Sequence, residues 1–417
     1  MGQPQSNFLR LFNFIFFSLR YNQTMKLFQN IPKTVLILGA ASLFTDISSE
    51  GIYSILPLFL TQVLGAGPLA LGIIEGIAET TASLLKVFSG IWTDRAKRRK
   101  PLVLWGYGIS SFLRPLIGLA QSWPAVLVLR FMDRVGKGIR SSPRDAMIAD
   151  VTTSSNRGAS FGLHSAMDNA GALVGPLLAS ALLSFTGIGL RDIILLSAIP
   201  SLIAWLTLLA IKEKKSAPKK IVKASHFMRD WGKLGAGFKL LLGILLIFTL
   251  GNSTDAFLLI RLHQLGIPLA LVPLLWGLHS GVRMVSAFYG GKLSDRIGRK
   301  AVILSGWIFY ALIYLSFALV AQTALVVAIF LAYGIFYGLC EPSEKAFVAD
   351  LAPQALRGTA FGYYNLVVGL FALPASVLFG WVGQTWGYPA AFTVGACFAG
   401  LASALLFFVR PLYKPSR

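Results

Sequence analysis

Charged side chains set inside long apolar stretches are the residues of this sequence whose chemistry stands out. Asp46 and Glu50 lie four residues apart, so on a helix they share one face, and their own apolar stretch holds no cation. Burial disfavours an ionised carboxylate and a nearby cation favours it, so a carboxyl group between these influences can change protonation near neutral pH. The residues that we single out for ion coupling or a solute pathway are Asp46, Glu50, Glu79, Arg114, Arg130, Asp133, Arg134, Lys137, Asp168, Asp255 and Glu341.

The elements that must position these charges are apolar segments of bilayer-spanning length. Of the 417 residues, 55% are hydrophobic and only 13% are charged, whereas soluble domains carry about 25% charged residues. Apolar stretches of about 18 residues or more recur along the chain, and each is long enough to cross a bilayer as a helix. The sequence therefore predicts an all-α integral membrane protein. Its twelve expected spans are residues 34–63, 69–92, 101–121, 125–145, 160–184, 193–211, 240–261, 269–290, 301–321, 324–345, 359–381 and 388–409.

The net charge of +21 is distributed in a way that indicates membrane orientation. Most Lys and Arg residues lie in loops on one side of the predicted membrane, and the loops on the other side hold almost no basic residue beyond Arg191. By the positive-inside rule both termini are expected in the cytoplasm, in a bacterial inner membrane. The pattern favours a topological role for the basic residues over nucleic-acid binding. About 30 of the 38 Lys and Arg residues fall in the termini and in alternate loops, at 93–100, 140–158, 212–239, 291–300 and 345–358.

One unit of the sequence is used twice, at an offset near 200 residues. GIWTDR at 90–95 matches GKLSDR at 291–296, and RGASFG at 157–162 matches RGTAFG at 357–362. Such repeats are typical of secondary transporters, which bind solute where the halves meet and rock the halves against each other. The predicted division is a cytoplasmic N-terminal extension at 1–33, a six-helix half at 34–211, a basic cytoplasmic linker at 212–239, a second six-helix half at 240–409 and a cytoplasmic tail at 410–417.

GKLSDRIGRK at 291–300 resembles the loop signature of the major facilitator superfamily (MFS), and the resemblance covers the chain from Thr34 onward. The first copy, GIWTDRAKRRK, departs from the signature at Ala96 and Lys97. The fold implied is twelve transmembrane helices in two pseudo-symmetric halves. Helices one, four, seven and ten would line a central cavity that holds a small-molecule substrate, without a cofactor or a dedicated metal site.

A second motif resembles the drug/proton antiporter branch of that family. Gly162, Gly171, Gly175 and Pro176 fit the fifth-helix pattern G-x8-G-x3-G-P, and we expect the three glycines to lie along one face of the helix. Ordinary close packing is an alternative role for these glycines. In the fourth span Arg130 resembles the arginine of the antiporter motif, although Arg134 stands where a glycine is usual.

The twin loops are predicted to be a conformational latch. Each glycine lets a neighbouring helix approach, and the aspartate one turn later can face a helix N-terminus, which is worth about 0.3–1 kcal/mol when exposed. The resemblance implies that these partners are helix eleven for the first loop and helix five for the second. The alternative is that the charges only fix topology. The latch residues are Gly90, Asp94, Arg95, Gly291, Asp295, Arg296 and Arg299.

Several charges also have a structural interpretation, because an ionised group at the middle of a bilayer costs about 2.5–3.5 kcal/mol. Glu79 with Lys86 and Asp133 with Lys137 are predicted to be salt bridges that fix helix register. Arg114 is expected to act as a gate, to pair with Glu75 or Glu79, or to contact lipid headgroups. His164 and Asp168 form either a proton relay or a buried hydrogen bond, and Cys340 and Cys397 are expected in the core.

The function predicted is proton-coupled efflux of a polar or amphiphilic organic compound by a monomeric carrier. The alternative is a carrier for metal ions or metal chelates, in either direction, with carboxylate ligands for the metal. A membrane enzyme or a receptor is disfavoured, because the sequence has no P-loop and no HExxH motif.

Overall fold

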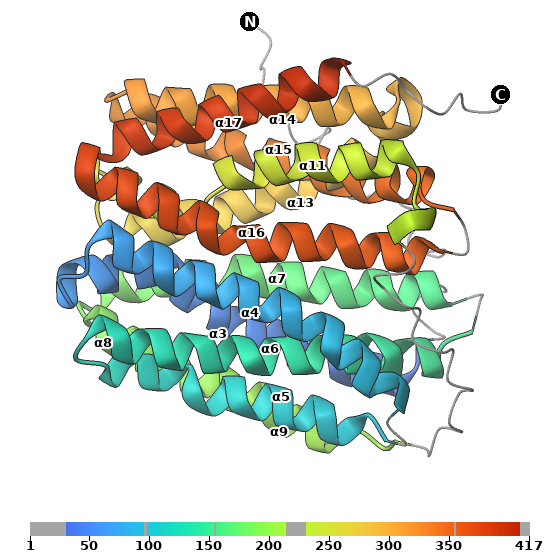
Figure 1. The fold of residues 1–417 in the computed structure, drawn as a ribbon. Coiled ribbons are helices and arrows are strands. Elements are labelled where there is room, and N and C mark those ends of the chain that lie inside the picture. The colour runs from blue at the N-terminus through green and yellow to red at the C-terminus, as the bar shows by residue number, and fades with distance from the viewer. Residues whose placement is uncertain (1–30, 96–97, 154–155, 214–230, 354–355, 409–417) are drawn as a thin grey trace, which may run out of the picture.

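The computed structural model describes residues 31–95, 98–153, 156–213, 231–353 and 356–408. The predicted tail, and most of the predicted N-terminal extension and linker, lie outside these residues. The described residues are helical throughout and connected by short loops (Figure 1). The first half contains α3 (Lys33–Leu58) with its π-helical continuation η1 (Phe59–Val63), α4 (Pro68–Arg95), α5 (Lys100–Leu113) with the 3₁₀ turn η2 (Pro115–Leu119), α6 (Trp123–Val151), α7 (Arg157–Phe185), α8 (Leu190–Leu196) and α9 (Ala198–Leu209).

The second half repeats this order. It contains a short 3₁₀ turn, η3 (Trp231–Lys233), then α11 (Ala236–Gly251), α12 (Ala256–Gln264), α13 (Leu271–Ile297), α14 (Arg299–Leu319), α15 (Thr323–Leu351), α16 (Arg357–Trp386) and α17 (Tyr388–Phe408).

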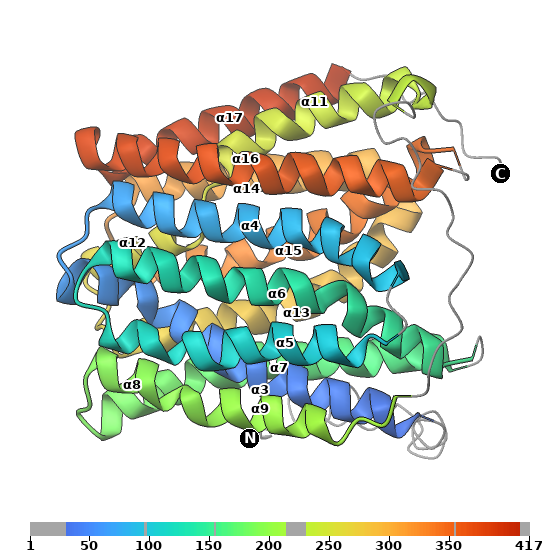
Figure 2. The same cartoon turned by 60° about the horizontal axis from the view of Figure 1, so that its bottom comes forward.

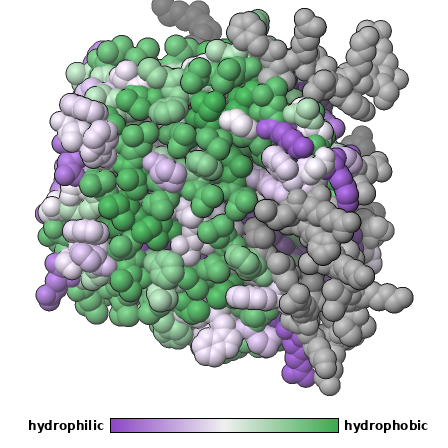
Figure 3. Space-filling model, viewed as in Figure 1, coloured by the Kyte–Doolittle hydropathy of each residue, from purple (hydrophilic) through white to green (hydrophobic). Residues whose placement is uncertain are grey.

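Ten of the described helical segments are long and apolar enough to cross a membrane. The two remaining long helices are α6 and α13, with 29 and 27 residues. Both are longer than the roughly 20 residues that a bilayer needs, and they lie among the other helices in Figures 1 and 2. With these two, the number of long helical segments among the described residues equals the number of spans that the sequence predicts. On the face that Figure 3 shows, apolar residues cover the middle of the molecule and hydrophilic residues lie toward its two ends.

Three spans of the described chain are interrupted where the sequence predicted continuous helices, and the sixth span is divided between α8 and α9 at Ser197. Pro115 has no backbone N–H to donate, and the third span changes there from α5 to the 3₁₀ turn η2, directly after Arg114. The seventh span breaks between α11 and α12, where Asn252 has non-helical dihedral angles of φ −99° and ψ 81°. Irregular backbone at membrane depth is tolerated where it lines a cavity, and this break leads directly to Asp255.

The two halves form separate bundles that meet along two helix pairs, α4 with α16 and α7 with α13 (Figures 1 and 2). We call the end of the bundle with residues 98–99, 211–213 and 298 the loop end, and the end with residues 64–67, 186–189 and 387 the far end.

Near the far end the helix pairs are in close contact. A Cβ atom at Gly76 of α4 would lie 2.9 Å from the Cα of Leu373, and one at Gly277 of α13 would lie 3.2 Å from the carbonyl oxygen of Leu173. Toward the loop end a Cβ atom at Gly162 or at Gly281 would meet open space among the described residues. Close contacts of glycines between the halves are therefore found toward the far end and not at Gly162 or Gly281.

The interiors of the two halves differ in chemistry. The second half is filled with aromatic rings, such as Trp307 stacked on Phe248 at 4.4 Å and Tyr310 stacked on Tyr314 at 4.2 Å. The first half instead buries four charged side chains, Glu75, Arg114, Arg130 and Asp133, each at most 2% exposed.

Candidate functional site

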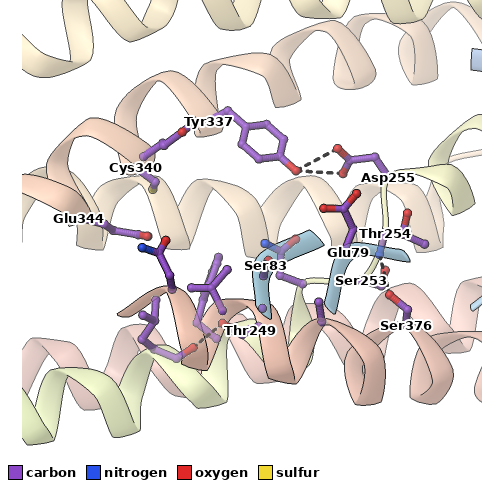
Figure 4. Close-up of a pocket in the computed structure, with 18 of the residues that line it drawn as sticks. Glu79, Ser83, Thr249, Ser253, Thr254, Asp255, Tyr337, Cys340, Glu344 and Ser376 are labelled. Atoms are coloured by element: carbon purple, nitrogen blue, oxygen red, sulfur yellow. Dashed lines mark hydrogen bonds between the residues drawn. The ribbon is translucent and has the colours of Figure 1, made fainter. Parts of the chain in front are cut away.

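A cavity of about 540 Å³ lies between the two halves and is lined by helices of both. Figure 4 shows part of its lining, with Glu79 and Ser83 facing Asp255, Tyr337 and Glu344. Five acidic and five basic side chains line it, so the lining charges are equal in number. These are Glu50, Glu79, Lys86, Arg134, Lys137, Asp255, Arg283, Glu341, Glu344 and Lys345.

Asp255 is presented to the cavity by the break in the seventh span. Tyr337 donates a hydrogen bond to its carboxylate at 2.9 Å (Figure 4), and Tyr333 donates a second one at 2.9 Å. Tyr53 of α3 lies 3.1 Å from the hydroxyl of Thr254, the preceding residue. Asp255 is thus fixed by hydroxyl groups, and within the described chain no cation lies within 4 Å of its carboxylate.

Glu50 has a similar environment on the first half. The indole N–H of Trp276 donates to its carboxylate at 3.1 Å, and the ring of Trp276 packs on Tyr53 with centroids 5.1 Å apart. Asp46 lies one turn closer to the loop end and outside the cavity lining, with the hydroxyl of Ser49 at 3.5 Å. The structure therefore separates these two acids, because Glu50 lines the cavity and Asp46 faces α7.

The ion pairs of the cavity differ from two that the sequence predicted. Glu79 pairs with Arg134 at 3.5 Å rather than with Lys86, and Asp133 does not pair with Lys137. Spacing along one helix allowed those pairs, but cations on neighbouring helices lie closer. Lys86 and Lys137 line the cavity, and neither has a carboxylate within 4 Å among the residues that the structure describes.

Three of the predicted residues belong to a buried ionic network behind the cavity wall. Arg114 bonds Asp133 at 2.8 Å, and Arg130 bonds Glu75 at 2.9 Å and lies 3.7 Å from Asp133. Arg114 also donates to the carbonyl oxygen of Thr45 at 3.2 Å. The pairing of Arg114 with Glu75 or Glu79 was wrong: the break at Pro115 lets its side chain reach α6 and α3, while Glu75 is held by Arg130 and Glu79 lies near Arg134.

The second half contributes a linked set of charges to the cavity. Glu341 accepts from Arg283 at 2.9 Å and from Lys345 at 2.8 Å. Glu344, which the sequence analysis did not single out, accepts from Trp307 at 2.9 Å and from Tyr364 at 3.0 Å. The internal repeat could have indicated Glu344, because this residue lies 200 residues after Arg144 and both halves therefore carry a charged residue at this position.

His164 and Asp168 lie 3.5 Å apart on α7, outside the cavity lining, with Arg144 at 4.0 Å from the same carboxylate oxygen. Both a relay and a structural contact remain compatible with this arrangement. Cys340 lies at the cavity wall and is 2% exposed, as expected of a core residue. Cys397 is exposed, so its expected core position was wrong: an apolar span also has a face that points away from the bundle.

The glycines of the fifth-helix motif lie on different faces of α7. Cβ atoms at Gly171 and Gly175 would lie 2.9 Å from the Cβ of Asp46 and from the backbone nitrogen of Gly51, so these glycines allow α7 to approach α3. Pro176 lies within the same helix. Gly162 meets open space, so the expectation of one common face was wrong. Nine residues correspond to about two and a half helical turns, which places Gly162 opposite Gly171.

The second loop is described more fully than the first. Asp295 pairs with Arg299 at 2.5 Å, and Arg299 lies 3.5 Å from Asp350 of α15. The side chain of Asp295 is 65% exposed. Gly90 and Gly291 lie within α4 and α13, and the side chains of Asp94 and Arg95 lie outside the description. Arg296 is exposed.

Among the described residues, no group of three or more His, Cys, Asp and Glu side chains is placed to hold a metal ion. The metal alternative therefore finds no support in the geometry.

The chain matches the family described as Major Facilitator Superfamily over residues 38–376 and 240–417. The chain belongs to this superfamily. An uncharacterized MFS-type transporter of Methanocaldococcus jannaschii is 33% identical over 391 residues, covering 91% of this chain and 96% of the relative. Multidrug resistance protein MdtG of Escherichia coli is 24% identical over 382 residues, covering 88% and 92%.

Solved structures of MFS-like transporters share the fold. The nucleoside transporter NupG superimposes with a TM-score of 0.77 at 16% identity, covering 90% of this chain and 98% of NupG. A bacterial homologue of the lysosomal transporter Spinster, in an inward-facing and unoccupied conformation, gives a TM-score of 0.72 at 16% identity, covering 90% and 96%. The chain is therefore a multi-pass membrane transporter of the MFS kind.

Proposed function

We propose that this transporter exports a polar or amphiphilic organic compound in exchange for protons, by alternating access. The observation that carries the proposal is the cavity between the halves, in which Glu50 and Asp255 face the solute space without a cationic partner in the described structure. A carboxylate that can bind either a proton or a solute is suited to antiport. The similarity to a multidrug resistance protein supports export of organic compounds.

The orientation that we propose places the loop end in the cytoplasm of a bacterial inner membrane, with both termini on that side. The concentration of Lys and Arg in the loops at this end supports it. The cavity extends from Trp276 toward the loop end, where Lys86, Lys345 and Tyr364 line it. In this orientation the structure represents an inward-facing state. The twin loops would then act as the cytoplasmic latch, and the carrier would work as a monomer.

Asp46 and Glu50 are the residues to which we assign proton exchange. Purified protein in proteoliposomes, loaded with a fluorescent organic cation and given an imposed pH gradient, tests the assignment. In Asp46→Asn with Glu50→Gln, gradient-driven flux is expected to fall to the level of empty liposomes.

Asp192→Asn provides the matched control, because Asp192 bonds the backbone N–H of Gly189 near the far end and lies outside the cavity. This control is expected to retain gradient-driven flux. Intact gradient-driven flux in the Asp46 and Glu50 double variant would show that the coupling assignment is wrong.

A further inference from the structure

The cavity lining holds charges of both signs that have no ion-pair partner among the described residues. Within the described chain three lining carboxylates have no cation within 4 Å. Glu50 and Asp255 face the part of the cavity nearer the far end, and Glu344 lies nearer the loop end, where it accepts from Trp307 and Tyr364. The cations without a carboxylate within 4 Å, within the described chain, are Lys86 and Lys137 of the first half. The remaining lining cations are engaged, Arg134 with Glu79 and both Arg283 and Lys345 with Glu341.

The acidic part of the cavity is built to receive a cationic group. Tyr53 connects its two carboxylates: its ring packs on Trp276, which donates to Glu50, and its hydroxyl contacts Thr254, next to Asp255. Aromatic faces attract cations, and Tyr337, which donates to Asp255, already carries the guanidinium of Arg283 on its ring at 4.3 Å. An ammonium group placed here would meet one carboxylate from each half.

The basic part lies where α4 and α6 cross. A Cβ atom at Gly138 would lie 3.4 Å from the carbonyl oxygen of Ala82, and Leu85 packs on the same glycine. Lys137 and Lys86 are the next residues along the two helices, so the crossing brings two ammonium groups to one wall. Two ammonium groups on the same wall within the membrane repel each other and are costly to bury, so an anionic group between them would be favourable. A carboxylate or phosphate of the solute would supply it.

We infer that the solute is a zwitterion, with its ammonium group between Glu50 and Asp255 and its anionic group on Lys86 and Lys137. This inference rests on the proposed export function and specifies its substrate class. A singly charged cation would leave the two lysines unneutralised, and a singly charged anion would leave the two carboxylates unneutralised. Lys86 lies seven residues beyond Glu79 on α4, about 10 Å along the helix, and Glu79 points into the same part of the cavity as Asp255 (Figure 4). The charges of the solute are therefore separated by several methylene groups or a ring.

Three probes of equal chain length test the inference by their binding to the purified full-length protein, measured by thermal shift and titration. They are ω-aminooctanoate, its methyl ester, which is only a cation, and its N-acetyl derivative, which is only an anion. The zwitterion is expected to bind at least about tenfold more tightly than either analogue, because it makes one more charge-assisted contact and such a contact changes the affinity by about this factor. In Lys86→Gln with Lys137→Gln, the advantage over the ester is lost while the ester still binds. In Asp255→Asn, the advantage over the N-acetyl acid is lost.

Lys100→Gln is the control, because Lys100 bonds the carbonyl oxygens of Leu209 and Ile211, away from the cavity. Equal binding of the ester and the zwitterion to the unaltered protein, or binding of none of the three probes, would overturn the inference. Export of the ester driven by the pH gradient, without a preference for the zwitterion, would overturn it and leave the proposed function standing. A preference for the zwitterion without any gradient-driven flux would contradict the proposed function and support the binding site.

Discussion

Tyr53 and Thr254 touch each other across the interface of the two halves, with their hydroxyl oxygens 3.1 Å apart, and they are separated by 201 residues. Gln62 and His263, which lie nearer the far end, are also separated by 201 residues, and their side-chain Nε2 atoms lie 2.6 Å apart. The repeat offset is also 201 between Gly90 and Gly291. Each pair therefore joins equivalent positions of the two halves, as expected where a pseudo-two-fold axis passes between α3 and α12. These contacts close the far end of the cavity.

Linking Gln62 to His263 is expected to stop transport, because alternating access requires the far end to open. The variant carries Gln62→Cys and His263→Cys, together with Cys340→Ala and Cys397→Ala, which remove the native thiols. A short bismaleimide bridging the two introduced thiols should reduce flux in proteoliposomes to background.

Each single-cysteine variant treated with the same reagent is the control, and it should keep its flux. Undiminished flux in the doubly linked protein would show that solute does not leave between α3 and α12.

The pairing of Arg114 with Asp133 is predicted to be structural. Both side chains are at most 2% exposed, and removing one partner of such a pair costs about 3–5 kcal/mol, because the other charge stays buried. Asp133→Asn should therefore lower the melting temperature of the detergent-purified protein strongly. Arg114→Met combined with Asp133→Leu should restore a large part of that loss. Asp46→Asn is the comparison, and it should leave the melting temperature nearly unchanged. A stable Asp133→Asn protein without transport would instead assign Asp133 to the transport cycle.

Substitution by valine is expected to lower the stability of the protein at Gly175 and to leave it nearly unchanged at Gly162. A Cβ at Gly175 lies 2.9 Å from the backbone nitrogen of Gly51, so Gly175→Val forces α7 away from α3 and should cost at least about 1–3 kcal/mol, as overpacking does. Gly162→Val places its side chain in open space and should melt close to the parent. Equal melting temperatures for the two variants would contradict the packing role of Gly175.

Sequence patterns predicted the spans and their duplication because apolar length and charge asymmetry are local properties of the chain. They did not predict the break before Asp255, since Asn252 to Thr254 interrupt an otherwise apolar span without a proline. Most of the charged residues were found, whereas the partners of Glu79, Arg114 and Asp133 were not. The carboxylate of Asp133 is shared by residues of two helices, and spacing along one helix cannot decide which cation of a neighbouring helix lies nearer.

Glu344 shows why the site was only partly predictable. One acidic residue in a stretch with Glu341 and Lys345 near a predicted loop is expected to be solvated, and only its bonds to Trp307 and Tyr364 place it at the cavity. The aromatic partners come from α14 and α16, so no local pattern contains the arrangement.

The latch at Asp295 is the last prediction, and it concerns the conformational equilibrium. The carboxylate is exposed and pairs with Arg299 of the neighbouring helix α14 in the conformation described, while the latch hypothesis places it against the N-terminus of α7 when the loop end closes. Asp295→Asn removes the charge that this helix end attracts, an interaction worth up to about 2 kcal/mol when partly buried. The loop end should then stay open for a larger fraction of the time.

A cysteine introduced at Ser83, in the cavity lining of α4, reports this opening. With Cys340→Ala and Cys397→Ala in the background, a membrane-impermeant maleimide applied from the loop end should label Ser83→Cys several-fold faster when Asp295→Asn is added. The matched Asp192→Asn change at the far end should leave the rate unchanged. An unchanged labelling rate in the Asp295 variant would mean that the loop only fixes topology, because a charge without effect on the equilibrium has no differential interaction with the two states.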